Sequence, residues 1–356
     1  MTSVPTRLAA TLSFRTIGAV YVWLAIVVLF SIWAPDTFPT AITVKQVLNG
    51  NAVAGLVALS VVPPLAARVF DLSVAYTMSL TSVLTAHFLV STGLGPFTAT
   101  ALAMAAALLV GVVNALVVVV LRVDSFIATL ATGALIQSLI TMVTNDSSIT
   151  GVQLLAKPFA NIAQLDAGGI TLPVLYLLLA ALAIWFVLEH TATGRRLYAT
   201  GFNADAARLQ GVRTDRLRFG TLVTSALLSG FAGVVFASSV GSGSPTAGSP
   251  YLLSAYAAAF VGATQLRAGR FNAWGTVIAV LLLGTGITGL GLATSAQWAA
   301  SLFTGSVLIV ALVLTGGRIA LPTVLRRRAG KLSGPDEPEG STDDESRAVP
   351  AGGSRS

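Results

Sequence analysis

The sequence predicts an all-α polytopic membrane protein with about ten transmembrane helices. Of its 356 residues, 54% are hydrophobic and 10% are charged, and the mean hydropathy is +0.83. A soluble domain carries about 25% charged residues, and a chain of this length has too small an interior for such an apolar surplus. Long apolar runs recur along the chain, and the basic residues between them are very unevenly distributed. These observations exclude a water-soluble enzyme.

The apolar runs give the individual spans in order. The first, Ile17–Trp33, follows a short basic leader (residues 1–16) and is longer than the apolar core of a typical signal peptide, so we predict an uncleaved span. At about 20 residues per crossing, nine further spans are predicted at 47–67, 72–91, 97–120, 126–144, 170–188, 219–240, 251–266, 273–292 and 297–315. The transmembrane domain therefore covers residues 17–320.

Two groups of four spans lie on either side of the sixth. The second span enters the membrane from outside and the seventh from inside, so the two groups have opposite topology. Inverted repeats of this kind build transporters with a central pathway between the repeats. The order of the spans thus favours two inverted-topology four-helix halves.

An even number of spans places both termini on one side, and the basic residues identify that side as the cytoplasm. With the N-terminus inside, the inner segments contain 19 of the 21 lysines and arginines, whereas the outer segments contain Lys45 and Lys157. A miscounted span would have mixed the two groups. The split also explains the net charge of +7, so we expect membrane lipid and no nucleic acid as a partner.

Residues 321–356 form a tail that is first basic and then acidic. Pro335–Glu345 combines six acidic residues with Gly, Pro and Ser. Such a segment cannot bury enough apolar area to offset the entropy lost on ordering. We therefore expect a disordered cytoplasmic tail.

Ionisable groups are scarce within the predicted spans. The chain has no cysteine, and its two histidines lack metal-ligand partners at suitable spacing, so neither a metal nor a cofactor is predicted. Asp71, Asp124 and Glu189 lie at predicted inner span ends. Carboxylates at mid-span are typical of proton- or ion-coupled carriers, and their absence argues against a carrier of that kind.

Asp71 precedes a span that is rich in hydroxyl groups between Ser73 and Ser82. These hydroxyls can solvate a sugar-like solute, but in membrane helices they also form hydrogen bonds to neighbouring helices. Asp71 itself can line a pathway or cap the following span. The sequence leaves both alternatives open.

The longest polar segment predicted inside is Glu189–Arg218. Within it we predict a short helix, Ala204–Leu209, that begins after the N-cap Asn203 and ends at Gly211. Its small residues suit contact with the groove of a cytoplasmic protein. An ordinary basic loop that obeys the positive-inside rule is the alternative.

Four stretches of the chain resemble segments of ribose-type ABC transporter permeases of the branched-chain amino acid/ribose permease superfamily, and they occur in the same order along the sequence as in that family. Residues 194–212, GRRLYATGFNADAARLQGV, resemble the segment "GRyiyAiGgNeeAArlsGi". Residues 71–74 (DLSV), 125–130 (SFIATL) and 244–248 (SPTAG) resemble "GiDLSvG", "paFIaTLg" and the outer loop "aqPtaGtgyEL". The resemblance runs from about residue 45 to 315.

This resemblance implies the permease subunit of an importer in the bacterial inner membrane, which is not itself an enzyme. Two permease copies, or a copy and a paralogue, would form the pathway. Two ATP-binding subunits would dock inside and a solute-binding protein would deliver the solute outside. The element that couples to the ATPase maps onto Gly201, Asn203, Ala206, Ala207 and Gly211, and the pathway signature maps onto Asp71, Leu72 and Ser73.

The chain departs from the family's pattern at several positions. Phe70 and Ala75 stand where the family has glycines, and the run Tyr251–Asn272 has lost its acidic residues. The solute therefore stays open among sugars, nucleosides and autoinducers. A carrier or facilitator that works without an ATPase, or an amino-acid or nucleoside ABC permease of the same superfamily, is the alternative function.

Overall fold

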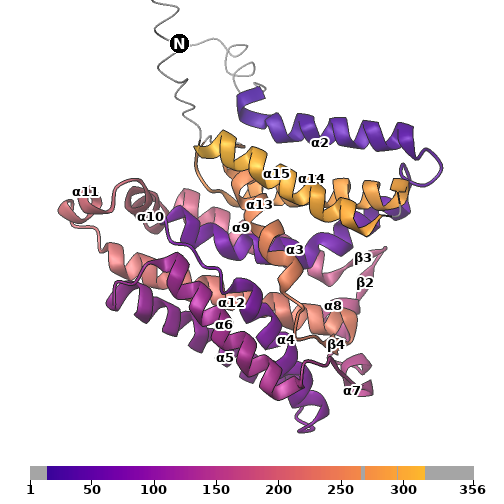
Figure 1. Cartoon of the computed structure of the whole chain (residues 1–356), viewed down its shortest axis with the longest axis horizontal. Coiled ribbons are helices and arrows are strands. Elements are labelled where there is room, and N and C mark those ends of the chain that lie inside the picture. The colour runs from indigo at the N-terminus through magenta and orange to yellow at the C-terminus, as the bar shows by residue number, and fades with distance from the viewer. Residues whose placement is uncertain (1–13, 266–268, 295, 317–356) are drawn as a thin grey trace, which may run out of the picture. The chain divides into compact units, whose positions relative to one another are not determined.

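The computed structural model describes residues 14–265, 269–294 and 296–316, which are mostly helical (Figure 1). Most of the leader and the whole predicted disordered tail lie outside the described residues. In the described part, each predicted apolar run is a helix: α2 (Phe14–Trp33), α3 (Ala41–Ala66), α4 (Val74–Val90), α5 (Pro96–Ala115), α6 (Ser125–Thr144), α9 (Leu172–His190), α12 (Thr214–Val240), α13 (Ser249–Ala263), α14 (Ala273–Thr294) and α15 (Gln297–Gly316). A π-helical turn, η1 (Leu116–Val120), continues α5.

Six helices of the described chain are long and apolar enough to cross a membrane: α3, α5 with η1, α6, α9, α12 and α14. Shorter apolar segments form α2, α4 and α15, and α13 has 15 residues. The protein is thus a polytopic membrane protein, while the number of ten spans stays a prediction. Two helices begin five or six residues earlier than predicted, α12 at Thr214 and α3 at Ala41. In both, polar residues at the start continue the helix beyond its apolar window.

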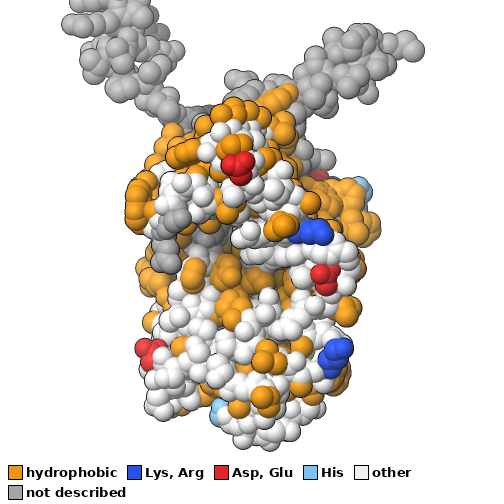
Figure 2. All heavy atoms as spheres, turned by 90° about the vertical axis from the view of Figure 1, so that its right-hand side faces the viewer, with side chains coloured by type: hydrophobic (Ala, Val, Ile, Leu, Met, Phe, Trp, Pro, Cys, Tyr) orange, Lys and Arg blue, Asp and Glu red, His pale blue; other side chains and the backbone are white. Residues whose placement is uncertain are grey.

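The connecting segments gather at opposite ends of the helices (Figure 1). At one end are α7 (Val152–Leu155), α8 (Asn161–Gln164) and the strands β1 (Ile149–Thr150), β2 (Asp166–Ala167), β3 (Ile170–Thr171) and β4 (Ser242–Gly243). β1 pairs with β4 and β2 with β3, both antiparallel. At the other end are α10 (Ala192–Phe202) and α11 (Ala204–Leu209). Figure 2 views the molecule from the end that carries α7, α8 and the strands, and it shows only isolated charged side chains there.

The helices α3, α4 and α12 are extensively buried, and α12 packs against both α3 and α4. In the apolar window of α3, 72% of the residues are buried, but only 28% are buried in α5 and in α6. The exposed surfaces of α5 and α6 carry large apolar side chains such as Leu109, Leu135 and Met142. Such surfaces are suited to lipid, because a helix satisfies its own backbone polar groups.

Glycines of α14 lie where other helices approach it closely. A Cβ on Gly284 would overlap Asn51 of α3, and one on Gly289 would overlap Phe30 of α2. The glycines of the Gly284–Gly289 segment therefore allow close helix packing, for which small residues are typical in membranes.

Candidate functional site

The chain between α3 and α4 is not helical, and this break contains Asp71. Pro63 and Pro64 lie in the last turn of α3, and Arg68 follows with a φ of 55°. The α3 helix therefore ends in a sharp turn, and the chain crosses the interior before α4 begins.

Side-chain hydroxyls from other helices satisfy the backbone of this break. The N–H of Phe70 donates to Ser125 Oγ (3.0 Å), and the N–H of Leu72 donates to Thr129 Oγ1 (3.0 Å), both on α6. The N–H of Asp71 donates to Tyr256 Oη of α13 (3.1 Å). Backbone groups without partners are very unfavourable inside a membrane protein. The three hydroxyls therefore stabilise the break.

The Asp71 carboxylate is fully buried and bonded on one side. Its Oδ1 accepts hydrogen bonds from the N–H (3.1 Å) and Oγ (2.6 Å) of Ser73, whose Oγ accepts one from Asn114 Nδ2 (2.7 Å). Within the described residues, Asp71 Oδ2, Asn114 Oδ1 and Ser225 Oγ have no hydrogen-bond partner. The described ion pairs also do not include Asp71. The carboxylate is thus held in place without a neutralising cation.

Two of the expectations for Asp71 need correction. The N-cap of α4 is Ser73, so Asp71 precedes the cap, although its carboxylate accepts from the Ser73 N–H. Asp71 also lies deeper than the inner span end, because its partner Tyr256 is at the middle of α13. The pattern of apolar residues could not show this depth, since it depends on where α3 stops.

The hydroxyl groups of α4 face its neighbours in the core. Thr81 Oγ1 donates to the carbonyl of Gly230 (2.9 Å), and the N–H of Gly248 donates to Ser79 Oγ (2.9 Å). Thr77 donates to the carbonyl of Ser73 (2.9 Å). All of these side chains are buried. The alternative in which the α4 hydroxyls bond to neighbouring elements is therefore confirmed for Thr81 and Ser79, whereas Thr77 bonds to the start of its own helix.

Phe70, which directly precedes Asp71, begins an aromatic cluster. Its ring lies 6.4 Å from that of Tyr256 and 6.3 Å from that of Phe126. The cluster continues through Phe260 to Phe271. Phe70 thus links α6 and α13 beside Asp71 through the area that aromatic pairs bury.

The predicted short helix of the basic segment is confirmed with its bounds. Asn203 Oδ1 accepts from the N–H groups of Asp205 (3.1 Å) and Ala206 (3.0 Å), as an N-cap does. Gly211 has a φ of +80°, which glycine adopts without strain. Arg208, near the end of α11, contacts Asp215 at the start of α12 (3.0 Å).

The faces of α10 and α11 differ from the expected ones. Ala207 is only 6% exposed, and a Cβ on Gly201 would overlap the carbonyl oxygen of Ala66 at the end of α3. These two residues therefore contact their own chain, and their part in a coupling element stays a prediction. Asn203, Ala206 and Gly211 are exposed.

Two large apolar side chains at this end of the molecule are missing from the sequence-based site. Phe202 is 86% exposed and Leu209 is 88% exposed, and they bracket α11. Both belong to a polar, basic segment with no lipid-facing stretch around it. An isolated Phe or Leu in such a segment was the signal that could have identified them.

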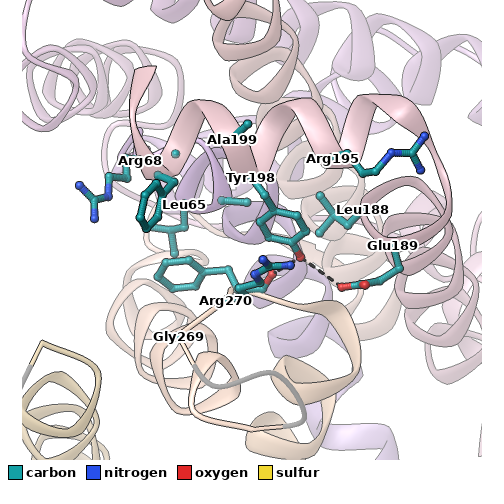
Figure 3. Close-up of a pocket in the computed structure, with 13 residues that line it drawn as sticks. Leu65, Arg68, Leu188, Glu189, Arg195, Tyr198, Ala199, Gly269 and Arg270 are labelled. Atoms are coloured by element: carbon teal, nitrogen blue, oxygen red, sulfur yellow. Dashed lines mark hydrogen bonds between the residues drawn. The ribbon is translucent and has the colours of Figure 1, made fainter. Parts of the chain in front are cut away.

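A cavity of about 640 Å³ lies between the end of α3, α10 and the segment that precedes α14. In Figure 3, Tyr198 of α10 points toward Arg270, while Arg68 and Arg195 point away. Tyr198 Oη donates to the carbonyl of Phe271 (2.8 Å) and lies 3.4 Å from Glu189 Oε1, and the Arg270 guanidinium is 5.3 Å from the Tyr198 ring centre. These contacts attach α10 to α9 and to the start of α14.

The described contacts around Asp71 and α10 hold the helices and their connecting segments in position. Within the described residues, no three His, Asp or Glu side chains are grouped to hold a metal ion. The described ionisable groups near α11 form surface ion pairs, Arg208 with Asp205 (3.8 Å) and Asp215. A conduit and a docking surface fit such residues better than a catalytic centre does.

Comparison with known proteins agrees with this interpretation. Residues 43–312 match the family described as branched-chain amino acid transport system / permease component. The ribose import permease protein RbsC of Bacillus subtilis is 32% identical over 289 residues, 81% of this chain and 89% of that protein. The D-allose transport system permease protein AlsC of Escherichia coli is 27% identical and covers 83% and 90%, respectively. The fructose import permease protein FrcC of Rhizobium meliloti is 27% identical and covers 80% and 81%.

The match extends from the first turn of α3 into α15 and includes both the Asp71 break and α10–α11. It confirms the resemblance that the four short motifs indicated. The chain therefore belongs to the family of branched-chain amino acid transport system permease components, and as a permease it is a membrane subunit and not an enzyme.

Proposed function

We propose that the protein is the transmembrane permease subunit of an ATP-driven importer for a sugar or sugar-like solute. The relatives are permeases for ribose, D-allose and fructose. The observation that carries the ATP-driven part is the exposed pair Phe202 and Leu209 on either side of α11. Large apolar side chains that protrude from a polar segment are typical anchors of a protein–protein interface. The partner is an ATP-binding subunit that docks on α10–α11.

The contacts of α10 and α11 connect such a partner to the interior. Gly201 lies against the carbonyl of Ala66, so α10 abuts the end of α3 just before the Asp71 break. Tyr198 ties α10 to Phe271, and Arg208 ties α11 to Asp215 of α12. Motion of α10–α11 therefore reaches α3, α12 and α14 together.

The arrangement of the connections supports the predicted topology of ten spans with both termini inside. The α3–α4 break, the α5–α6 connection and α11 line one hollow of about 460 Å³, so segments predicted to be inside share one end. At the other end, Asn49 at the start of α3 binds the backbone of Gly169 and Thr171 between α8 and α9. An even number of crossings between the termini fits this grouping.

Cysteine labelling checks the orientation. We expect a single cysteine at Lys157 to react with an impermeant thiol reagent added to intact cells, because this site lies on the outer side. A cysteine at Gln210 should react only after permeabilisation. The chain has no native cysteine to confuse the result. Reaction of Gln210→Cys in intact cells would contradict the proposed orientation.

Neighbouring alanines of α11 separate docking from folding. Ala206 is exposed and Ala207 is buried. We expect Ala206→Glu to keep membrane abundance and to weaken ATPase docking, whereas Ala207→Glu lowers abundance because it buries a charge without a partner. Immunoblots of membranes and co-purification of the ATPase measure the two effects. Equal abundance of both variants would show that α11 is not packed as described.

The function itself is tested by reconstitution. Proteoliposomes that contain the permease, the ATPase and an external solute-binding protein should accumulate ribose, D-allose or fructose only with ATP. Thermal shifts of the binding protein identify the solute first, since a ligand at 100 times its Kd stabilises by about 2.7 kcal/mol. Amino acids and nucleosides belong in the same screen, because the family description names amino acids.

A carrier that works without an ATPase is the second candidate. It is favoured by one observation, the fully buried Asp71 carboxylate, which has no ion pair within the described residues. Buried carboxylates at membrane depth are common in ion-coupled carriers. Uptake into vesicles by the permease alone, driven by an ion gradient, would favour this candidate over the importer.

A further inference from the structure

A polar stripe runs along α6 and has no counterpart in the rest of that helix. Small and polar residues recur at every fourth position: Ser125, Thr129, Gly133, Gln137 and Thr141. The first two hold the Asp71 break, as described above. Gly133 lies flat against the Tyr76 ring of α4, which leaves no space for a Cβ. The rest of the stripe, Gln137 and Thr141, is accessible at the surface of the described chain.

The open part of the stripe borders a hollow of about 510 Å³, lined by Tyr76, Gln137, Thr141 and their neighbours Ala134 and Ser138. Within the described residues, the side chains of Tyr76, Gln137 and Thr141 form no hydrogen bond. Three polar groups without partners therefore converge on one hollow. Each can donate and accept hydrogen bonds.

The opposite side of α6 carries large exposed apolar side chains, as is typical of a surface that faces lipid. Leu135 is 68% exposed and Leu139 is 52% exposed. At 100° per residue, Gln137 lies about 200° from either leucine around the helix axis. A glutamine amide at mid-span without a partner is unfavourable against lipid. The stripe must therefore face something more polar than acyl chains.

We propose that the α4–α6 hollow is a contact site for the transported polyhydroxylated solute, with Tyr76, Gln137 and Thr141 as the residues that bind it. This inference rests on the proposed function in taking the solute to be a sugar. An amide and two hydroxyls match the alternating donors and acceptors of a polyol. The site adjoins the Asp71 break through Ser125 and Thr129, so the same elements that α10 contacts also position it.

Cysteine accessibility provides the first test, in cells that also express the ATPase and the binding protein. We expect Gln137→Cys and Thr141→Cys to react with a charged, membrane-impermeant methanethiosulfonate at least tenfold faster than Leu135→Cys and Leu139→Cys. The leucine positions are matched controls on the same helix. Labelling does not depend on the energy source, so it separates this inference from the proposed function. Fast labelling together with ATP-independent uptake would retain the site and reject the importer.

Uptake provides the second test. Gln137→Leu preserves size and removes the amide, and Thr141→Val removes the hydroxyl. We expect each to reduce uptake of the solute, chosen from ribose, D-allose and fructose, at least tenfold at equal membrane abundance. The control is Leu139→Val, a conservative change on the opposite side of α6, which should leave uptake within twofold.

Three outcomes would overturn the site. Slow labelling of Gln137→Cys with oxidative cross-linking between two copies would show that the stripe is a helix–helix contact. Slow labelling without cross-linking would show that it faces lipid. Fast labelling with normal uptake by Gln137→Leu and Thr141→Val would show a water-filled crevice outside the solute's route.

Discussion

Replacing both Phe202 and Leu209 by serine is expected to abolish ATPase binding while the permease still accumulates in the membrane. Both side chains are almost fully exposed, so their removal takes nothing from the core. Truncation of an apolar interface anchor typically weakens binding by 2–4 kcal/mol, which is roughly 30- to 1,000-fold in Kd. ATP-dependent uptake should fall with complex formation. Co-purification of the ATPase and uptake at matched abundance measure the two losses.

Gln210→Ala is the matched control, because Gln210 is exposed beside Leu209 and is polar. It should leave the complex intact. Retention of the ATPase by the Phe202→Ser/Leu209→Ser variant would contradict docking on α10–α11. The importer would then need another interior surface as its contact.

The second large effect is expected at Asp71. Asp71→Ala leaves the N–H and Oγ of Ser73 without their acceptor in a fully buried place. Each buried donor without a partner destabilises by about 1–3 kcal/mol, so we expect the variant, with two such donors, to lose roughly 2–6 kcal/mol of stability. Thermal unfolding of the purified permease in lipid nanodiscs and its abundance in membranes report this loss. Asp71→Asn keeps an acceptor at Oδ1 and should retain most of the stability.

Asp36→Ala is the control for Asp71, since Asp36 lies exposed in the connection after α2. Uptake per molecule by Asp71→Asn then isolates the charge. Normal uptake would restrict Asp71 to hydrogen bonding within the break, whereas loss of uptake at normal abundance would assign a role to the carboxylate itself. Normal stability of Asp71→Ala would contradict the described bonding.

The parts of the fold that depend on local pattern could be predicted from the sequence. Apolar runs located the helices, and Asn203 with Gly211 defined α11, because an N-cap and a positive φ are properties of a few consecutive residues. Where a helix starts in polar sequence, as α12 does at Thr214, the predicted start lies several residues too far along the chain. Hydropathy reports the apolar part of a helix and not its full length.

The candidate site depended on tertiary contacts and was predicted only in part. The burial of Ala207 and the depth of Asp71 follow from the packing of α10 and from the end of α3, which no local pattern reveals. The stripe that ends in Gln137 and Thr141 was visible as a four-residue spacing. Its meaning required the knowledge that Leu135 and Leu139 face the opposite way.

The contact between Gly201 and Ala66 has a mechanical consequence. A side chain placed between two elements can absorb a small displacement by changing its rotamer, but here backbone meets backbone. A displacement of the Phe202 end of α10 is therefore transmitted directly to the last carbonyl group of α3. If an ATP-binding subunit docks on α10–α11 as proposed, its motion should reach α3 directly through this backbone contact, without rearrangement of a side chain between the two helices.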